Sequence, residues 1–125
     1  MEPKTVYLAC AAEDELYRGL FTTQWSRAGA TARFLGPPEE DAPDEDWQRE
    51  VRARVRESDG VIALIGGYSE TSDEALWPIR CAVAEKKPLL GLWMETQHRV
   101  KPTVMGSARC KGWTWENIGE FLEAI

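Results

Sequence analysis

The feature that most constrains the fold is the apolar run Val-Ile-Ala-Leu-Ile at residues 61–65, the most continuous one in the chain. Its apolar residues do not alternate with polar ones, a pattern typical of a strand buried on both faces, as in parallel sheets covered by helices. Glycines bound the run, with Gly60 before it and Gly66 and Gly67 after it. We therefore expect a central strand of an α/β sheet at this position.

Segments with strand and helix patterns alternate along the rest of the chain. Further strands are expected at residues 5–11, 31–35 and 88–93, and a short last one before residue 111. Four helices are expected. The first passes through Leu16, Leu20 and Trp25 and ends at Gly29, the second passes through Trp47, Val51 and Val55, and the third runs to about Glu85. The last follows Thr114, which can cap it, with Trp113 and Ile118 as a hydrophobic staple. Parallel strands need crossover helices, so this order predicts a doubly wound three-layer α/β sandwich with a mostly parallel, flavodoxin-like sheet of four or five strands.

Length and charge restrict the domain organisation and the partners. A chain of 125 residues fits one domain, residues 1–125. The net charge is -6, from 21 acidic and 15 basic residues, so nucleic acid and anionic membranes are not expected as partners. No apolar run is long enough to span a bilayer and the start lacks the apolar stretch of a secretory signal, so a soluble, cytoplasmic protein is expected.

Metal and redox chemistry find little support in the sequence. Three widely separated cysteines, Cys10, Cys81 and Cys110, lack zinc or disulfide spacing, so we interpret them as buried thiols. The only histidine, His98, cannot build a metal cluster or a Ser-His-Asp triad, and no metal site is expected. Six acids within residues 39–46 lack the alternation of a Ca²⁺ loop and are interpreted as a solvated loop.

Ligands of doubly wound sheets bind at the carboxyl ends of the strands, which selects the loops at residues 11–15, 36–46 and 66–77. The last is the most informative, because a dozen residues exceed the usual length of a strand-to-helix loop. Pro78 is unfavourable inside a helix, so we expect the third helix to begin there, with Trp77 at its mouth. Trp77 would then either stack on a ligand ring or plug the sheet edge.

Five further positions are candidate contacts for a nucleotide. Ala11 and Asp14 lie in the first loop, although Asp14 also suits a helix N-terminus. Tyr68 and Ser69 lie at the exit of the third strand, where ribose or phosphate contacts are expected, although both also suit a turn. Arg80, in the first turn of the expected third helix, can meet a phosphate or simply face solvent.

Several segments together resemble the bacterial Toll/interleukin-receptor-like (TIR-like) domains, including small sensor proteins of antiphage systems that act on NAD+. The resemblance rests on residues 6–10 (Val-Tyr-Leu-Ala-Cys), Glu13-Asp14, residues 58–66, Lys87-Pro88 and the Trp-Thr-Trp at residues 113–115, and it covers nearly the whole chain. It implies the same fold, a role in signalling or defence, homotypic association, and NAD+ as substrate or ligand with no bound cofactor.

The resemblance also implies a catalytic glutamate, which this chain lacks. Active members carry Trp-Glu-Ile at the start of the third helix, where this chain has Trp77, Pro78 and Ile79. Proline offers neither charge nor acceptor to stabilise the cation that forms as nicotinamide leaves. Glu74 and Glu70, on the preceding loop, are the candidate substitutes.

Several functions remain open on these residues. We expect a TIR-like signalling or defence domain with an NAD-type pocket and impaired catalysis; the alternatives are an active NAD+ glycohydrolase or cyclase using Glu74 or Glu70, and a non-enzymatic association module. A phosphoacceptor receiver is disfavoured because Gly66 and Gly67 occupy the place of its aspartate. A nucleoside deoxyribosyltransferase-like enzyme needs a nucleophilic carboxylate near the start of the same helix. Pro78 at that place therefore disfavours this class of enzyme.

Overall fold

The computed structural model describes residues 3–27, 32–38, 44–97 and 99–125. Within these residues, five strands form a single sheet in the order β2-β1-β3-β4-β5, and every neighbouring pair is parallel. The strands are β1 (Thr5–Ala9), β2 (Arg33–Leu35), β3 (Gly60–Ile65), β4 (Leu89–Trp93) and β5 (Arg109–Gly112). The predicted parallel α/β fold is confirmed, with five strands.

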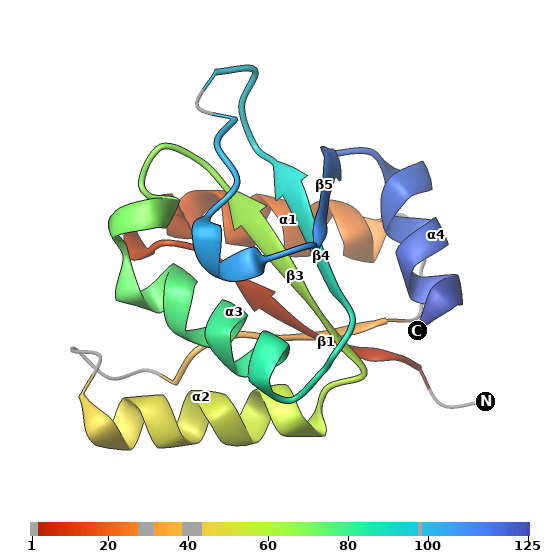
Figure 1. The fold of residues 1–125 in the computed structure, drawn as a ribbon. Helices are drawn as coiled ribbons and strands as arrows, with labels where there is room; N and C mark the ends of the chain where they lie inside the picture. The colour runs from red at the N-terminus through yellow and green to blue at the C-terminus, as the bar shows by residue number, and fades with distance from the viewer. Residues whose placement is uncertain (1–2, 28–31, 39–43, 98) are drawn as a thin grey trace.

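Helices cover both faces of the sheet. They are α1 (Glu15–Arg27), α2 (Glu45–Glu57), α3 (Asp73–Ala84) and α4 (Trp115–Ala124). In Figure 1, α2 and α3 lie side by side in front of the sheet, and α1 runs behind it. The buried side chains of α1 and α4 belong to one core layer, and those of α2 and α3 belong to the other.

The central strand β3 supplies side chains to both core layers. All six of its residues are buried. Val61 and Ile65 pack in the layer that contains α2 and α3, whereas Ile62 and Leu64 pack in the layer that contains α1 and α4. This two-sided burial explains why the run at residues 61–65 is apolar without alternation, and it confirms the predicted central strand.

The caps of α2 and α4 follow from their sequences. Asp44 caps α2, since its Oδ1 accepts a hydrogen bond from the Trp47 backbone N–H at 2.9 Å. Trp47, Val51 and Val55 form the buried face of α2, as their spacing predicts. The predicted cap of the last helix is also confirmed, because Thr114 Oγ1 accepts a hydrogen bond from the Asn117 N–H at 3.1 Å.

The predicted start of the third helix is wrong. α3 begins at Asp73, so Pro78 is the sixth residue of the helix, Trp77 lies before it rather than at the helix mouth, and Arg80 is exposed near the helix middle. Proline removes one helical hydrogen bond and costs about 3 kcal/mol relative to alanine. Burial of Ala75, Pro78 and Ile79 against the sheet offsets that cost, so tertiary packing overrides local propensity here.

The predicted apolar face of α1 is also wrong. Leu16 and Leu20 are 87% and 47% exposed, whereas Phe21 and Trp25 are buried. Leu16 and Trp25 are nine residues apart, which places them on opposite sides of a helix with about 3.6 residues per turn. Only the side that carries Phe21 and Trp25 faces the sheet.

Three smaller expectations have mixed outcomes. Cys10 and Cys81 are buried thiols, as predicted, but Cys110 is only half-buried. The predicted helix end at Gly29 and residues 39–43 of the acidic run lie outside the described residues. No helix in the described part of the chain is both long enough and apolar enough to cross a membrane.

Candidate functional site

Acidic groups meet where β1, β3 and β4 end. After β1, a 3-10 turn (Ala12–Asp14) leads into α1, and the Asp14 N–H donates to the Ala11 carbonyl at 2.9 Å. A Cβ on Gly66, directly after β3, would lie 3.3 Å from Asp14 Oδ2, 3.6 Å from Glu95 Oε1 and 2.7 Å from Met94 Cε. A side chain at position 66 would therefore contact both carboxylates and require the Met94 methyl group to move. We call Asp14, Gly66 and Glu95 the acidic edge.

Asp14 is the most unusual group of the acidic edge. The residue is 3% exposed, and its Oδ2 atom has no hydrogen-bond partner among the described residues. Burial raises the pKa of the Asp14 carboxyl above its ordinary value, and the neighbouring Glu95 and Glu13 carboxylates raise it further. A hydroxyl donor or a cation bound at this oxygen would relieve the unfavourable burial.

Two arginines converge on the other side of β1, at the end of β2. Arg54 Nη1 donates to the carbonyl of Gly36 at 2.7 Å, and a Cβ on Gly36 would lie 3.8 Å from Arg18 Cδ. Arg18 Nη2 donates to Cys10 Sγ at 3.1 Å, while the buried Arg18 Nε has no partner in the described part of the chain. Around the end of β1 the charge is therefore positive toward β2 and negative toward β3 and β4.

Tyr7 lies in β1 and Cys10 directly follows it. Neither side chain is activated as a nucleophile. Burial raises the pKa of the Tyr7 hydroxyl, with Arg18 and Arg54 acting in the opposite direction, and that hydroxyl has no partner among the described residues. Burial likewise raises the pKa of the Cys10 thiol despite the neighbouring Arg18. Both groups therefore stay protonated near neutral pH.

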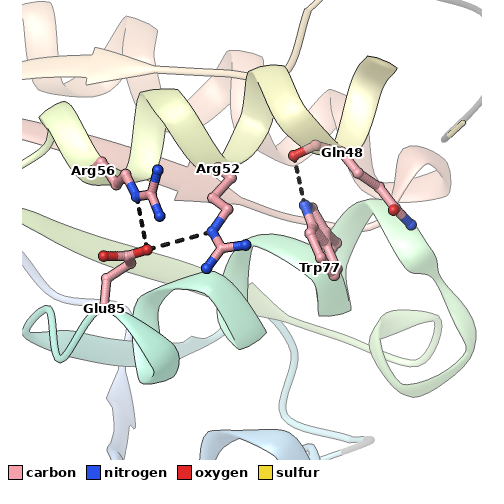
Figure 2. Close-up of polar contacts among 5 residues, drawn as sticks. All are labelled: Gln48, Arg52, Arg56, Trp77 and Glu85. Atoms are coloured by element: carbon pink, nitrogen blue, oxygen red, sulfur yellow. Dashed lines mark hydrogen bonds and ion pairs between the residues drawn. The ribbon is translucent and has the colours of Figure 1, made fainter. Parts of the chain in front are cut away.

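The structure uses Trp77 to join two helices. Its Nε1–H donates to the backbone carbonyl of Gln48 on α2 at 2.9 Å, as Figure 2 shows. At the other end of α3, Glu85 Oε1 accepts from Arg56 at 2.8 Å and from Arg52 at 3.4 Å, both on α2. We call this pair of contacts the α2–α3 seam. Trp77 is half-buried in the seam, where its ring packs against the core.

The two candidate substitute glutamates lie elsewhere. Glu74 is in the first turn of α3, and its Oε2 accepts a hydrogen bond from the Ser72 hydroxyl at 3.0 Å. Glu70 is exposed and lines a hollow of about 280 Å³ together with Arg80. Neither carboxylate is among the groups that meet at Gly66.

The other predicted contacts divide between the edge and the surface. Ser69 is buried, and its hydroxyl accepts from the Gly66 N–H at 2.9 Å and donates to the Leu64 carbonyl at 3.5 Å, so it fixes the turn after β3. Ala11 is buried beside Asp14, whereas Tyr68 is about half exposed. The structure thus brings Ala11, Asp14 and Ser69 to the strand ends and leaves Tyr68 and Trp77 outside the acidic edge.

Three residues of this region were not predicted from the sequence: Gly66 as a contact point, Glu95 and Arg18. The position of Glu95 two residues after β4 could have revealed it, because the same strand-end rule that selected Asp14 applies there. Within the described ranges, no group of three or more His, Cys, Asp or Glu residues could hold a metal ion.

The chain matches no protein-family model and no curated protein. Among solved structures, it resembles the CMP N-glycosidase BcmB of Clostridium botulinum, with 18% identity, a TM-score of 0.56 and coverage of 97% of this chain and 96% of that one. It also resembles a 3-dehydroquinate dehydratase-like protein from Bifidobacterium longum, with 13% identity, a TM-score of 0.49 and coverage of 100% and 95%. At this identity the likeness to the glycosidase supports the α/β fold alone.

Proposed function

We propose that this domain binds a ribosyl nucleotide of the NAD+ type at the carboxyl ends of β1 and β3, with little or no turnover. The observation that carries the proposal is the buried Oδ2 of Asp14, which has no hydrogen-bond partner among the described residues. Ribose hydroxyls are donors that such an oxygen lacks, and a hydrogen bond to an ionised carboxylate is stronger than one between neutral groups. Binding would also lower the raised pKa of Asp14, because hydrogen bonds to the charged form favour it.

The charge asymmetry around β1 supports one orientation of the ligand. The phosphates would lie toward Arg18, whose Nε has no partner among the described residues, and the ribose toward Asp14. A guanidinium fits phosphate oxygens, whereas the carboxylates of Asp14 and Glu95 would repel them. The positively charged ring of NAD+ can lie beside those two carboxylates, because opposite charges attract.

Impaired catalysis is proposed from the residues of α3. The resemblance to TIR-like enzymes implies a glutamate at the position of Pro78, which carries no charge and is buried inside the helix. Glu74 accepts a hydrogen bond from Ser72 instead of meeting the acidic edge. A glutamate at position 78 would stabilise the cation that develops as nicotinamide leaves, and Pro78 supplies no such charge.

Hydrolysis of an N-glycosidic bond is the second candidate function, and the pairing of Asp14 with Glu95 favours it. A carboxyl group with a raised pKa beside a second carboxylate is the arrangement that glycosidases use as acid and nucleophile or base. The C. botulinum protein of similar fold is named a CMP N-glycosidase, so CMP belongs among the compounds tested. Glu74 and Glu70 remain the alternative carboxylates for this function.

The test combines binding and turnover. Calorimetry should detect NAD+ binding to the wild type and at least about tenfold weaker binding to Asp14→Asn, which keeps the shape but loses the charge. Val83→Ala, on the exposed side of α3, is the matched control and should bind normally. Equal binding by wild type and Asp14→Asn, or no binding by either, contradicts the proposal.

Turnover is measured as release of nicotinamide from NAD+ and of cytosine from CMP. The proposal expects no release by the wild type. Release that Asp14→Asn or Glu95→Gln abolishes would establish the second candidate function in its place. Release that Glu74→Gln or Glu70→Gln abolishes would assign it to the loop glutamates.

The biological role is proposed on the same basis, as a TIR-like signalling or defence module of the cytoplasm that associates with its own kind. The exposed Leu16 and Leu20 on α1 support association, because apolar side chains on one helix face favour contact with a partner. Light scattering with and without NAD+ tests this. A dimer that Leu16→Ser with Leu20→Ser dissociates is expected, and a monomer at all concentrations contradicts it.

A further inference from the structure

A second pocket lies between α1 and the start of α4, with a volume of about 390 Å³. Its lining residues are Tyr17, Leu20, Gln24, Met94, Trp113, Thr114 and Trp115. Three of the seven are aromatic, and we call this site the aromatic pocket. The Tyr17 and Trp113 ring centroids are 6.4 Å apart with the planes tilted by 58°, and Trp115 is 38% exposed.

Acidic residues adjoin two of the lining residues of the aromatic pocket in the chain. Of the residues that the structure describes, no lysine or arginine lines the pocket. Glu116 follows Trp115 in the first turn of α4, and Glu95 follows Met94. Met94 also reaches the point beside Gly66 where Asp14 and Glu95 converge, so this side chain borders both the pocket and the acidic edge.

Aromatic faces and nearby carboxylates select the same kind of ligand. The face of a tryptophan or tyrosine ring carries negative electrostatic potential, and a cation over it is attracted. Primary ammonium ions are compact and strongly hydrated, whereas delocalised or alkylated cations are more easily removed from water. We propose that the aromatic pocket binds a small, weakly hydrated organic cation, with an N-alkylated pyridinium as the representative ligand.

The aromatic pocket and the proposed nucleotide site share Met94 as a border but depend on different side chains. Asp14 carries the proposed function, whereas Tyr17, Trp113 and Trp115 carry this inference. A ligand of the pocket therefore needs neither ribose nor phosphate. The experiment uses a free cation, so its failure leaves the NAD+ proposal standing, and loss of NAD+ binding leaves the pocket standing.

The probe is 1-methylnicotinamide, compared with nicotinamide, which has the same ring and carboxamide but no charge. Both are titrated into the full chain while the indole N–H signals of Trp113 and Trp115 are followed by NMR. The cation should shift both signals to saturation, with at least about tenfold tighter binding than the neutral amide. Equal binding of the two compounds, or no saturable shift by the cation, overturns the inference.

Substitutions of Tyr17 test whether its aromatic face, rather than its bulk, binds the cation. Tyr17→Leu should weaken binding of 1-methylnicotinamide about fivefold to tenfold, whereas Tyr17→Phe keeps the aromatic face and should bind within about twofold of wild type. Because Tyr17 packs against Trp113, Trp115→Leu at the more exposed ring serves as a second variant with the same expected loss. Tyr17→Phe as weak as Tyr17→Leu, or unchanged binding in both leucine variants, contradicts the cation–ring contact.

Discussion

The α2–α3 seam and the end of β1 treat their polar groups in opposite ways. In the seam, the Trp77 indole N–H and the Glu85 carboxylate both have partners on α2 (Figure 2). At the end of β1, Asp14 Oδ2 and Arg18 Nε are buried without partners among the described residues. Buried polar groups are nearly always hydrogen-bonded, so an exception calls for an explanation, and a ligand is one. This contrast is the reason for placing the proposed ligand at β1 rather than at α3.

The largest effect is expected from breaking the seam. Trp77→Ala removes a half-buried ring and its hydrogen bond to Gln48 and should lower the free energy of unfolding by about 3 kcal/mol. Trp77→Phe keeps most of the ring and should lose only about 1 kcal/mol. Urea unfolding measures both. Normal NAD+ binding by the folded Trp77→Phe variant would support placing the ligand at β1 rather than at α3. Loss of NAD+ binding without loss of stability would contradict that placement.

A smaller effect of opposite sign is expected at Asp14. Because the folded pKa of Asp14 is raised, the folded state binds more protons than the unfolded state between the ordinary carboxyl pKa of about 4 and the folded pKa. Wild-type stability should therefore fall as pH rises through the folded pKa and then level off. Asp14→Asn should lack this fall and be about 1 kcal/mol more stable than wild type at pH 7. If the stability of the two proteins changes with pH in the same way between pH 4 and neutrality, the ionised Asp14 carboxylate does not destabilise the folded state, and the prediction is contradicted.

Restoring the helical hydrogen bond at Pro78 tests whether α3 is purely structural. Pro78→Ala should raise the free energy of unfolding by about 1 kcal/mol, because the regained N–H outweighs the lost ring packing. NAD+ binding should not change. Pro78→Glu serves in the turnover assay, with Pro78→Ala as its control, and nicotinamide release gained only by Pro78→Glu would show that the α3 position faces the ligand after all.

The smallest effect is expected at the other end of the seam. The hydrogen bond from Arg56 lowers the pKa of Glu85, so its stabilising contribution is present above the ordinary carboxylate pKa and is lost as pH falls through the folded pKa. Glu85→Gln should cause a slight loss of stability at low salt, and high salt should remove the difference because the pair is accessible to solvent. A loss that persists at high salt contradicts this weak, screened contact.

Much of the fold could be predicted because its signals are local. The unalternated run at residues 61–65, the spacing of Trp47, Val51 and Val55, and the cap at Thr114 each depend on neighbouring residues in the chain. The start of α3 could not be predicted from Pro78, because burial against the sheet offsets the cost of an interior proline. The exposed side of α1 was misassigned because Leu16 and Trp25 were placed on one face.

The site was predicted less completely because it depends on packing between distant segments. Asp14 followed from the rule that ligands bind at strand ends, but its neighbours Glu95 and Gly66 come from segments that follow two other strands. Glu95 follows β4 in a segment with no periodic pattern. The partner of Trp77 is a backbone carbonyl 29 residues away, and no side-chain pattern reveals such a contact.

The most direct test of the account is a titration of the full chain with NAD+ followed by backbone amide and indole NMR signals. The account predicts saturable shifts of the Asp14, Gly66 and Glu95 amides, and no shift of the Trp77 indole N–H bound to Gln48. Asp14→Asn should need at least about tenfold more NAD+ to reach the same shifts. Shifts centred on Trp77 and the following residues of α3, with the acidic edge unchanged, would contradict the account.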